Sequence, residues 1–303
     1  MNKETHIMNY PHVAFSADHN YIMPTSVAIL SLLECSRDCK PCIYLLHDDS
    51  VTKEDFAMLA ALVAPYDTSL HYLNVGNRFE NAHEDHGVTK ATYYRLLLPE
   101  LLPDLSKVIY CDGDILFQCS VSELWGYELS DNLVAGVHRQ NYTLPEFAKY
   151  ISSIGLDPST YINAGILILN LDGLRKDNIE SKMSNFAQSK YKYQDQDLIN
   201  ITFQGRIFYL PERFNAPPYK SLGSNMLHGI VHYCGVKPWK QYNHTAFEWW
   251  MYYRKTPFYD ADYEYRYSLS LLNPEYTSVE LIKMLLRKLL RPLIRQLKLW
   301  IGK

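Results

Sequence analysis

The stretch 106-SKVIYCDGDILFQ-118 places two aspartates, Asp112 and Asp114, between two apolar runs. Carboxylates are costly among apolar neighbours unless a positive partner neutralises them. Residues i and i+2 of an extended strand point to the same side, so both carboxylates should face one hard divalent cation. Gly113, between them, would let a diphosphate approach the backbone. This stretch therefore predicts a buried strand that ends in a metal and phosphate site.

Strand and helix patterns alternate on either side of this stretch, and a capping box at Thr52 and Asp55 marks one helix start. Repeated β–α–β units predict an α/β fold, a Rossmann-like, mostly parallel, right-handed sheet flanked by helices. Ligands gather beyond the carboxyl ends of such strands, so Asp18 and Asp112 should line one crevice. The expected strands are 12–17, 41–46, 69–75, 107–110, 162–171 and 229–235, and the expected helices are 21–34, 53–63, 91–102 and 193–203.

A second candidate segment, 232-HYCGVKPW-239, follows a late apolar run. His232 could complete the metal shell and Lys237 could contact a phosphate oxygen, although both residue types are also ordinary at a strand's rim. Carboxylate ligands select Mg²⁺ or Mn²⁺, and an imidazole ligand favours Mn²⁺.

Six blocks of the sequence together resemble family 8 of the retaining glycosyltransferases, which includes bacterial lipooligosaccharide galactosyltransferases and glucosyltransferases and glycogenin. The resemblance covers about residues 12–245. It implies a GT-A catalytic domain over 12–273, after a polar leader at 1–11. It also implies transfer of a hexose, galactose or glucose, from a UDP-sugar to a saccharide acceptor of the lipid-linked or lipopolysaccharide type. The blocks are FSADHNY, ATYYRLLL, YCDGDILF (with the DXD motif), INAGILILNL, YQDQDLIN and VHYCGVKPW.

The same resemblance assigns roles residue by residue. The metal ligands would be Asp112, Asp114 and His232. The catalytic group would be Arg95, Asp195 and Gln196. The remaining residues would bind the donor. Ser16, Asp18, Asn20 and Tyr21 would bind the uridine, and Thr92 would lie along the donor. Asn163 and Ala164 would form the shelf beneath the sugar, and Gly113, Gly235 and Lys237 would lie at the diphosphate.

Two positions depart from the family pattern. Only Val236 lies between Gly235 and Lys237, where relatives commonly have two residues, so Lys237 would reach the diphosphate by a different path. His138 stands where many relatives carry an acid near the sugar hydroxyls, which leaves the donor sugar open.

Two other classes of function remain open at this point. A nucleotidyltransferase or phosphohydrolase would need a Gly-rich or basic loop after the first strand, and 16-SADHNY-21 has none. A non-catalytic UDP-sugar-binding protein would bind the donor without turnover.

The charge is asymmetric along the chain. Residues 278–303 carry a net charge of +6 and the rest −9, and apolar residues recur there at helical spacing. This pattern is typical of an amphipathic helix on an anionic lipid surface, so the tail at 274–303 predicts peripheral membrane association. No secretory signal or membrane-spanning run is present, which indicates a cytoplasmic protein at the inner face of the membrane. No motif supports nucleic-acid binding.

Cys35, Cys39 and Cys42 have a spacing that can hold an iron–sulfur cluster or, with His47, zinc. A thiol-rich turn between a helix and a strand is the expected alternative.

Overall fold

The structure is a computed structural model that describes residues 10–80, 82, 84, 89–178, 191–218, 228–235, 237–240 and 245–272. The predicted tail at 274–303, and the leader before residue 10, lie outside the described residues.

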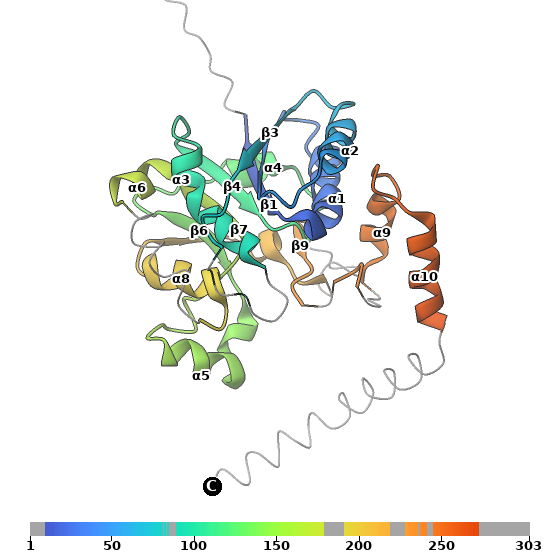
Figure 1. The fold of residues 1–303 in the computed structure, drawn as a ribbon. Coiled ribbons are helices and arrows are strands. Elements are labelled where there is room, and N and C mark those ends of the chain that lie inside the picture. Colours follow the sequence, from blue (N-terminus) through green and yellow to red (C-terminus); the bar gives the residue numbers. More distant parts are fainter. Residues whose placement is uncertain are drawn as a thin grey trace, which may run out of the picture.

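A seven-stranded sheet forms the centre of the molecule, in the order β3-β2-β1-β4-β7-β6-β8 (Figure 1). Neighbouring strands are parallel except that β7 is antiparallel to both β4 and β6. The α/β prediction is confirmed, with a mixed, mostly parallel sheet. The strands are β1 (His12–Ala17), β2 (Cys42–His47), β3 (Ser69–Asn74), β4 (Lys107–Cys111), β6 (Val134–His138), β7 (Ile162–Asn170) and β8 (Ile207–Tyr209).

Side-chain alternation along the strands builds a core on each face of the sheet. Val13 and Phe15 of β1 pack with one set of helices, α1 (His19–Cys35), α2 (Lys53–Val63) and α4 (Val121–Trp125). Ala14 faces the other set, η1 (Lys90–Leu97), α3 (Leu98–Leu101), α6 (Leu171–Lys176) and α8 (Gln194–Thr202). The predicted capping box at Thr52 and Asp55 is present. The helix predicted at 91–102 is instead a 3-10 helix through Leu97, with one α-helical turn after it.

A second, two-stranded sheet pairs β5 (Ile115–Phe117) with β9 (Ile230–His232), antiparallel. Beside it, Trp249 of α9 (Phe247–Tyr253) packs in one cluster with Val27 of α1, and α10 (Ala261–Leu272) covers the outer side of α9 (Figure 1). Further short elements are η2 (Gln140–Thr143), α5 (Pro145–Ser153) and η3 (Glu212–Asn215).

Asp112 and Asp114 were expected to lie in one extended strand, and this expectation is wrong. The chain leaves the main sheet at Cys111, turns through Gly113 and Asp114, and enters the second sheet at Ile115. The turn packs against α1, because a Cβ added to Gly113 would stand 2.2 Å from Oγ1 of Thr25. The two carboxylates are thus brought together by a turn that joins two sheets.

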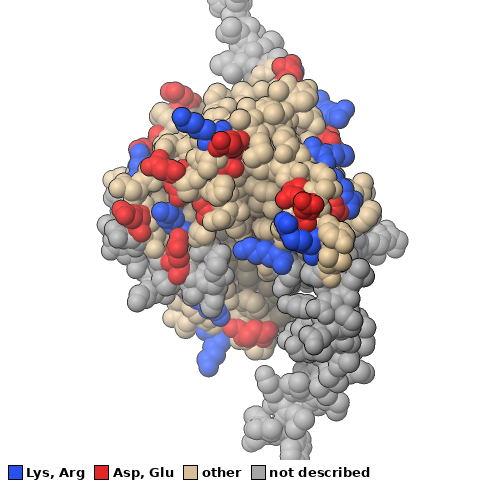
Figure 2. Space-filling view, turned by 45° about the vertical axis from the view of Figure 1, so that its right-hand side comes forward, with Lys and Arg blue, Asp and Glu red and all other residues tan. Residues whose placement is uncertain are grey.

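Acidic and basic side chains are interspersed over the face of the molecule in Figure 2.

Within the described residues, no helix combines the length and the apolarity that a membrane crossing requires.

Candidate active site

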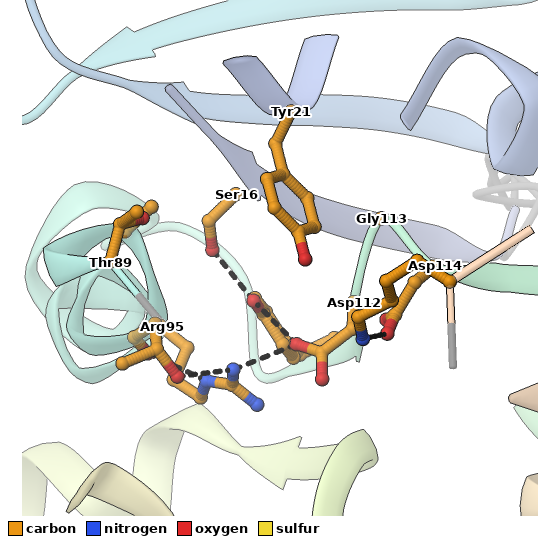
Figure 3. Close-up of a pocket in the computed structure, with 11 residues that line it drawn as sticks. Ser16, Tyr21, Thr89, Arg95, Asp112, Gly113 and Asp114 are labelled. Atoms are coloured by element: carbon orange, nitrogen blue, oxygen red, sulfur yellow. Dashed lines mark hydrogen bonds and ion pairs between the residues drawn. The ribbon is translucent and has the colours of Figure 1, made fainter. Parts of the chain in front are cut away.

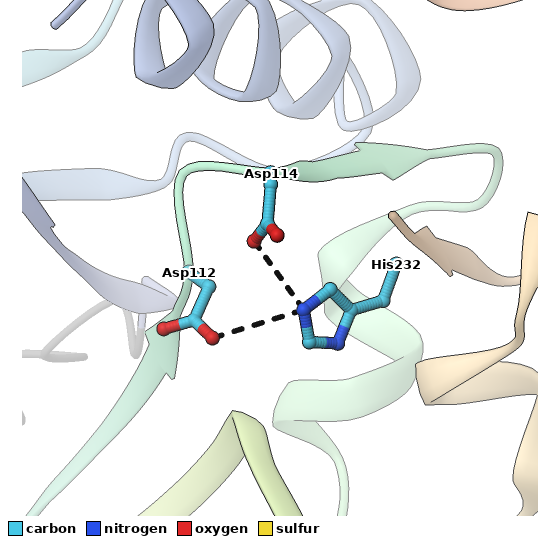
Figure 4. A group of neighbouring side chains, drawn as sticks. All are labelled: Asp112, Asp114 and His232. Carbon is cyan, nitrogen blue, oxygen red and sulfur yellow. Dashed lines mark ion pairs between the residues drawn. The ribbon is translucent and has the colours of Figure 1, made fainter. Parts of the chain in front are cut away.

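Three side chains from three chain positions meet where the two sheets join (Figure 4). Asp112 follows β4, Asp114 precedes β5, and His232 ends β9. Nε2 of His232 lies 3.3 Å from Oδ1 of Asp114 and 3.8 Å from Oδ2 of Asp112. One ligand atom from each residue lies within 4.8 Å of the others, and this is the one such group of three acidic, cysteine or histidine residues in the described part of the chain.

The chemistry and the space of this group fit a divalent cation. Two carboxylates and one imidazole suit Mn²⁺ or Mg²⁺. Gly165 of β7 lies directly beside them, and a Cβ there would stand 2.1 Å from Cε1 of His232 and 2.8 Å from Oδ2 of Asp112. The absence of a side chain at residue 165 therefore makes room for the ligand group.

Two cations flank the carboxylates. Nζ of Lys237 forms an ion pair and hydrogen bond with Oδ2 of Asp114. Although burial opposes ionisation, Lys237 and His232 hold the pKa of Asp114 well below its usual range. On the other side, Nη2 of Arg95 donates to Oδ1 of Asp112 at 2.7 Å. A diphosphate bound here would therefore meet a cation on each side.

Asp195, at the start of α8, is buried against the same arginine. Its Oδ2 lies 3.0 Å from Nε of Arg95, and its Oδ1 accepts a hydrogen bond from the hydroxyl of Thr92. Burial raises the pKa of Asp195 to about 6, although Arg95 works in the opposite direction. Arg95 thus holds two carboxylates, those of Asp112 and Asp195, in fixed positions.

Asp112, Asp114 and His232 are called the metal group below. The surface beside them is formed where the pairing of β7 with β6 is irregular. Gly136 of β6 pairs with Leu167, but the next residue, Val137, pairs with Asn163, so residues 164–166 have no partner on β6. Asn163 and Ala164 contact Gln196 of α8 here, since Oε1 of Gln196 accepts from Nδ2 of Asn163 at 2.9 Å and from the Ala164 amide at 3.2 Å. The structure therefore brings the predicted shelf and Gln196 together.

The residues at the end of β1 and the start of α1 divide into two groups. Ser16 and Tyr21 line a hollow of about 110 Å³ together with Arg95, Asp112 and Lys237 (Figure 3). Asp18 caps α1, because its carboxylate accepts from the Tyr21 amide at 3.1 Å, and Asn20 is exposed. The hollow is also lined by Thr89, Ala91, Thr92, Tyr110, Gly113 and Asp114, whereas neither Asp18 nor Asn20 belongs to its lining.

The sequence was compared with models of known protein families. The family described as "Glycosyl transferase family 8" matches residues 12–243. The chain belongs to this family.

Individual relatives agree with this assignment. A Haemophilus influenzae protein provisionally named a glycosyltransferase is 31% identical over 239 residues, which are 74% of this chain and 71% of that protein. The lipopolysaccharide 1,3-galactosyltransferase of Salmonella typhimurium is 26% identical over 247 residues, covering 75% of this chain and 72% of that enzyme. The galactosyltransferase LgtC, solved with donor and acceptor sugar analogues, superposes with a TM-score of 0.72 at 26% identity, over 84% of this chain and 99% of that chain. The fold is therefore that of LgtC, and the chain is a family 8 glycosyltransferase.

The two departures from the family 8 pattern have structural outcomes. Gly235 adopts φ +110°, a conformation that favours glycine, and Lys237 reaches Asp114 rather than standing apart from the metal group. Nδ1 of His138 lies 2.9 Å from the carbonyl oxygen of Tyr161. The next residue, Arg139, is buried and donates hydrogen bonds to the side chains of Asn215 and Cys234.

Sequence reasoning missed three residues of this family 8 site, Gly165, Asn215 and Arg139. Gly165 follows Asn163 and Ala164 directly, and a glycine inside a predicted strand often marks the close approach of another group. No local pattern marks Asn215 or Arg139, because each acquires its role from partners far away in the sequence.

The three cysteines of the C-x3-C-x2-C spacing do not converge. Sγ of Cys35 lies 3.2 Å from the Phe117 carbonyl oxygen, Cys39 lies near Ser120, and Sγ of Cys42 lies 3.2 Å from the hydroxyl of Tyr44. None of them belongs to a metal-binding group in the described residues, so the thiol-rich turn is the supported interpretation.

Proposed function

We propose that this chain is a retaining, metal-dependent glycosyltransferase that transfers galactose or glucose from a UDP-sugar to a saccharide acceptor, of the lipid-linked or lipopolysaccharide type. The observation that carries the proposal is the Asp112–Asp114–His232 group with Arg95 on one side and Lys237 on the other. Relatives named as lipopolysaccharide glucosyltransferases and galactosyltransferases support the hexose and the acceptor class.

The site suits the charge changes of glycosyl transfer. When the bond between the anomeric carbon and the diphosphate breaks, its electron pair leaves on UDP and negative charge builds there. A bound Mn²⁺ or Mg²⁺ supplies Lewis-acid stabilisation of that charge. Lys237, whose side chain is largely buried beside Asp114, adds a second positive charge from within the protein.

The remaining proposed roles concern the sugar. Asn163 and Ala164 would form the shelf beneath it, and Asp195 and Gln196 would lie near the anomeric carbon as it gains positive charge. Ser16, Asp18, Asn20 and Tyr21 would bind the uridine. Thr92 and Arg95 would lie along the donor, and Gly235 and Lys237 would clamp the diphosphate. Because no carboxylate is assigned as a nucleophile, we propose attack by the acceptor hydroxyl on the face that UDP leaves, with the hydroxyl proton passing to an oxygen of the departing diphosphate.

A donor screen tests this function. Purified protein with Mn²⁺ is incubated with UDP-galactose, UDP-glucose and their N-acetyl forms, and released UDP is measured. We expect slow hydrolysis of one neutral hexose donor and its loss, by at least about 100-fold, in Asp112→Asn, because removing a metal ligand removes charge stabilisation. The control Asp104→Asn replaces an exposed aspartate and should leave hydrolysis unchanged. Donor binding without any turnover would instead favour a UDP-sugar-binding protein.

We also propose that residues 278–303 attach the enzyme to the inner face of the cytoplasmic membrane, where lipid-linked acceptors are built. The +6 charge of this segment and its helical apolar spacing support that placement.

A further inference from the structure

Asn215, at the end of η3, is fully buried and bonds to both the metal group and the sugar shelf. Its Oδ1 lies 2.9 Å from Nδ1 of His232 and accepts a hydrogen bond from Nη2 of Arg139 at 2.6 Å. Its Nδ2 donates to Oδ1 of Asn163 at 2.8 Å. One amide group thus joins a metal ligand to the floor on which Gln196 rests.

The orientation of this amide is fixed by partners whose roles are unambiguous. A guanidinium group can only donate, so the Asn215 atom facing Arg139 must be the oxygen. Independently, Oδ1 of Asn163 accepts from the backbone amide of Gly165 at 3.1 Å, which fixes the Asn163 amide as well. The Asn215 atom facing that oxygen must therefore be the nitrogen, which again leaves the Asn215 oxygen facing Arg139.

The fixed oxygen determines which ring nitrogen of His232 carries a proton. Nδ1 faces an atom that can only accept, so Nδ1 must be protonated in order to bond to it. Nε2 faces Asp112 and Asp114, so it is the nitrogen that would offer its lone pair to a metal bound between them.

We propose that Asn215 is a positioning residue that sets the tautomer and the direction of the metal ligand His232, with Arg139 holding the Asn215 amide in the required orientation. The inference rests on the proposed metal-dependent function and assigns a role to residues outside the ligand set. Partners of this kind typically contribute 10- to 100-fold to metal affinity.

Mn²⁺ affinity, measured by calorimetry on the full chain with UDP present, gives the first test. We expect Asn215→Leu to weaken Mn²⁺ binding by about 10- to 100-fold, because the ring loses its acceptor. Asn215→Asp keeps an acceptor oxygen for His232 and Arg139, so it should restore most of that affinity. The control is Asn170→Leu, which removes two amide hydrogen bonds where Asn215→Leu removes three, and which lies at the end of β7 away from Asn163. Equal Mn²⁺ affinity in wild type and Asn215→Leu would overturn the proposal.

The wild-type protein provides a second test that does not depend on any variant folding. The ring nitrogens of His232 are observed by ¹⁵N NMR in protein saturated with Mg²⁺ and UDP, and assigned by comparison with His232→Gln. We expect a proton on Nδ1 and none on Nε2, and the reverse arrangement would refute the inference. The two proposals can fail separately: absent donor hydrolysis with this tautomer intact counts against the function alone.

Discussion

The imidazole of His232 lies so close to Gly165 that a methyl group on that glycine would overlap the ring, 2.1 Å from Cε1. Gly165 also accepts the Asp112 amide hydrogen bond through its carbonyl oxygen at 2.8 Å. One residue of β7 therefore supports one candidate metal ligand, Asp112, through its backbone and makes room for another, His232, by lacking a side chain.

Gly165→Ala should disrupt the metal group while the fold persists. The added Cβ must displace either His232 or Asp112, since both lie under 3.0 Å from it. We expect Mn²⁺ affinity to fall by at least about tenfold, the lower range for losing a support of a ligand, as measured by calorimetry. Gly126→Ala is the matched control, because a Cβ there would lie 3.6 Å from its nearest neighbour. Unchanged Mn²⁺ binding in Gly165→Ala would show that His232 is not held against this strand.

Arg95→Met should destabilise the protein strongly. Arg95 is 3% exposed and its removal leaves the carboxylates of Asp112 and Asp195 without their shared cation. Breaking such a buried pair costs about 3–5 kcal/mol, measurable as a change in the free energy of unfolding by urea. Arg78→Met breaks an exposed pair with Glu100 and should cost about 0–1 kcal/mol. Equal effects of the two substitutions would contradict the central role of Arg95.

Asp195 should make the protein less stable as the pH rises. Its pKa in the folded protein is about 6, against an ordinary value of 3.8, and burial is the main cause. Between these two values the folded state binds more protons than the unfolded state, so the free energy of unfolding decreases with increasing pH. Relative to wild type, Asp195→Asn should therefore gain stability from pH 4 to pH 7, by on the order of 3 kcal/mol. A pH-independent difference between the two unfolding curves would argue against a raised pKa.

Deletion of residues 278–303 should release the enzyme from anionic membranes. Seven basic residues stand against one acidic residue in this segment, so binding to vesicles with anionic lipid should weaken with salt. We expect the truncated protein to lose vesicle co-sedimentation while its hydrolysis of the UDP-sugar stays intact. Full co-sedimentation of the truncated protein would place the membrane contact elsewhere.

Much of the architecture follows from local sequence patterns. The apolar run after Pro11, the capping box at Thr52 and Asp55 and the strand before Asp112 all lie where periodicity placed them. These elements are predictable because each depends on neighbouring residues alone. The convergence of Asp112, Asp114 and His232 also agrees with the expected site.

The parts that sequence could not predict depend on distant partners. The turn at Gly113 forms because the chain passes from one sheet to the other, which alternation within a single strand does not reveal. Arg139 and Asn215 are separated by 76 residues, and Asn215 and His232 by 17. A buried hydrogen-bond network of this kind leaves no periodic signal, since each member needs only one suitably placed partner.

The pairing of β6 with β7 shifts in register between Gly136 and Val137. Because of this shift, adding or removing a residue would have different effects at the two ends of β7. Loss of a residue between Ile162 and Gly165 would displace Asn163 and Ala164 from Gln196, while the pairing of β4 with residues 166–170 could stay as it is. The same loss between Leu167 and Asn170 would exchange inward and outward side chains along the rest of the strand. A change in length at the Ile162 end would therefore alter the site, whereas a change at the Asn170 end would alter which of the two cores each side chain enters.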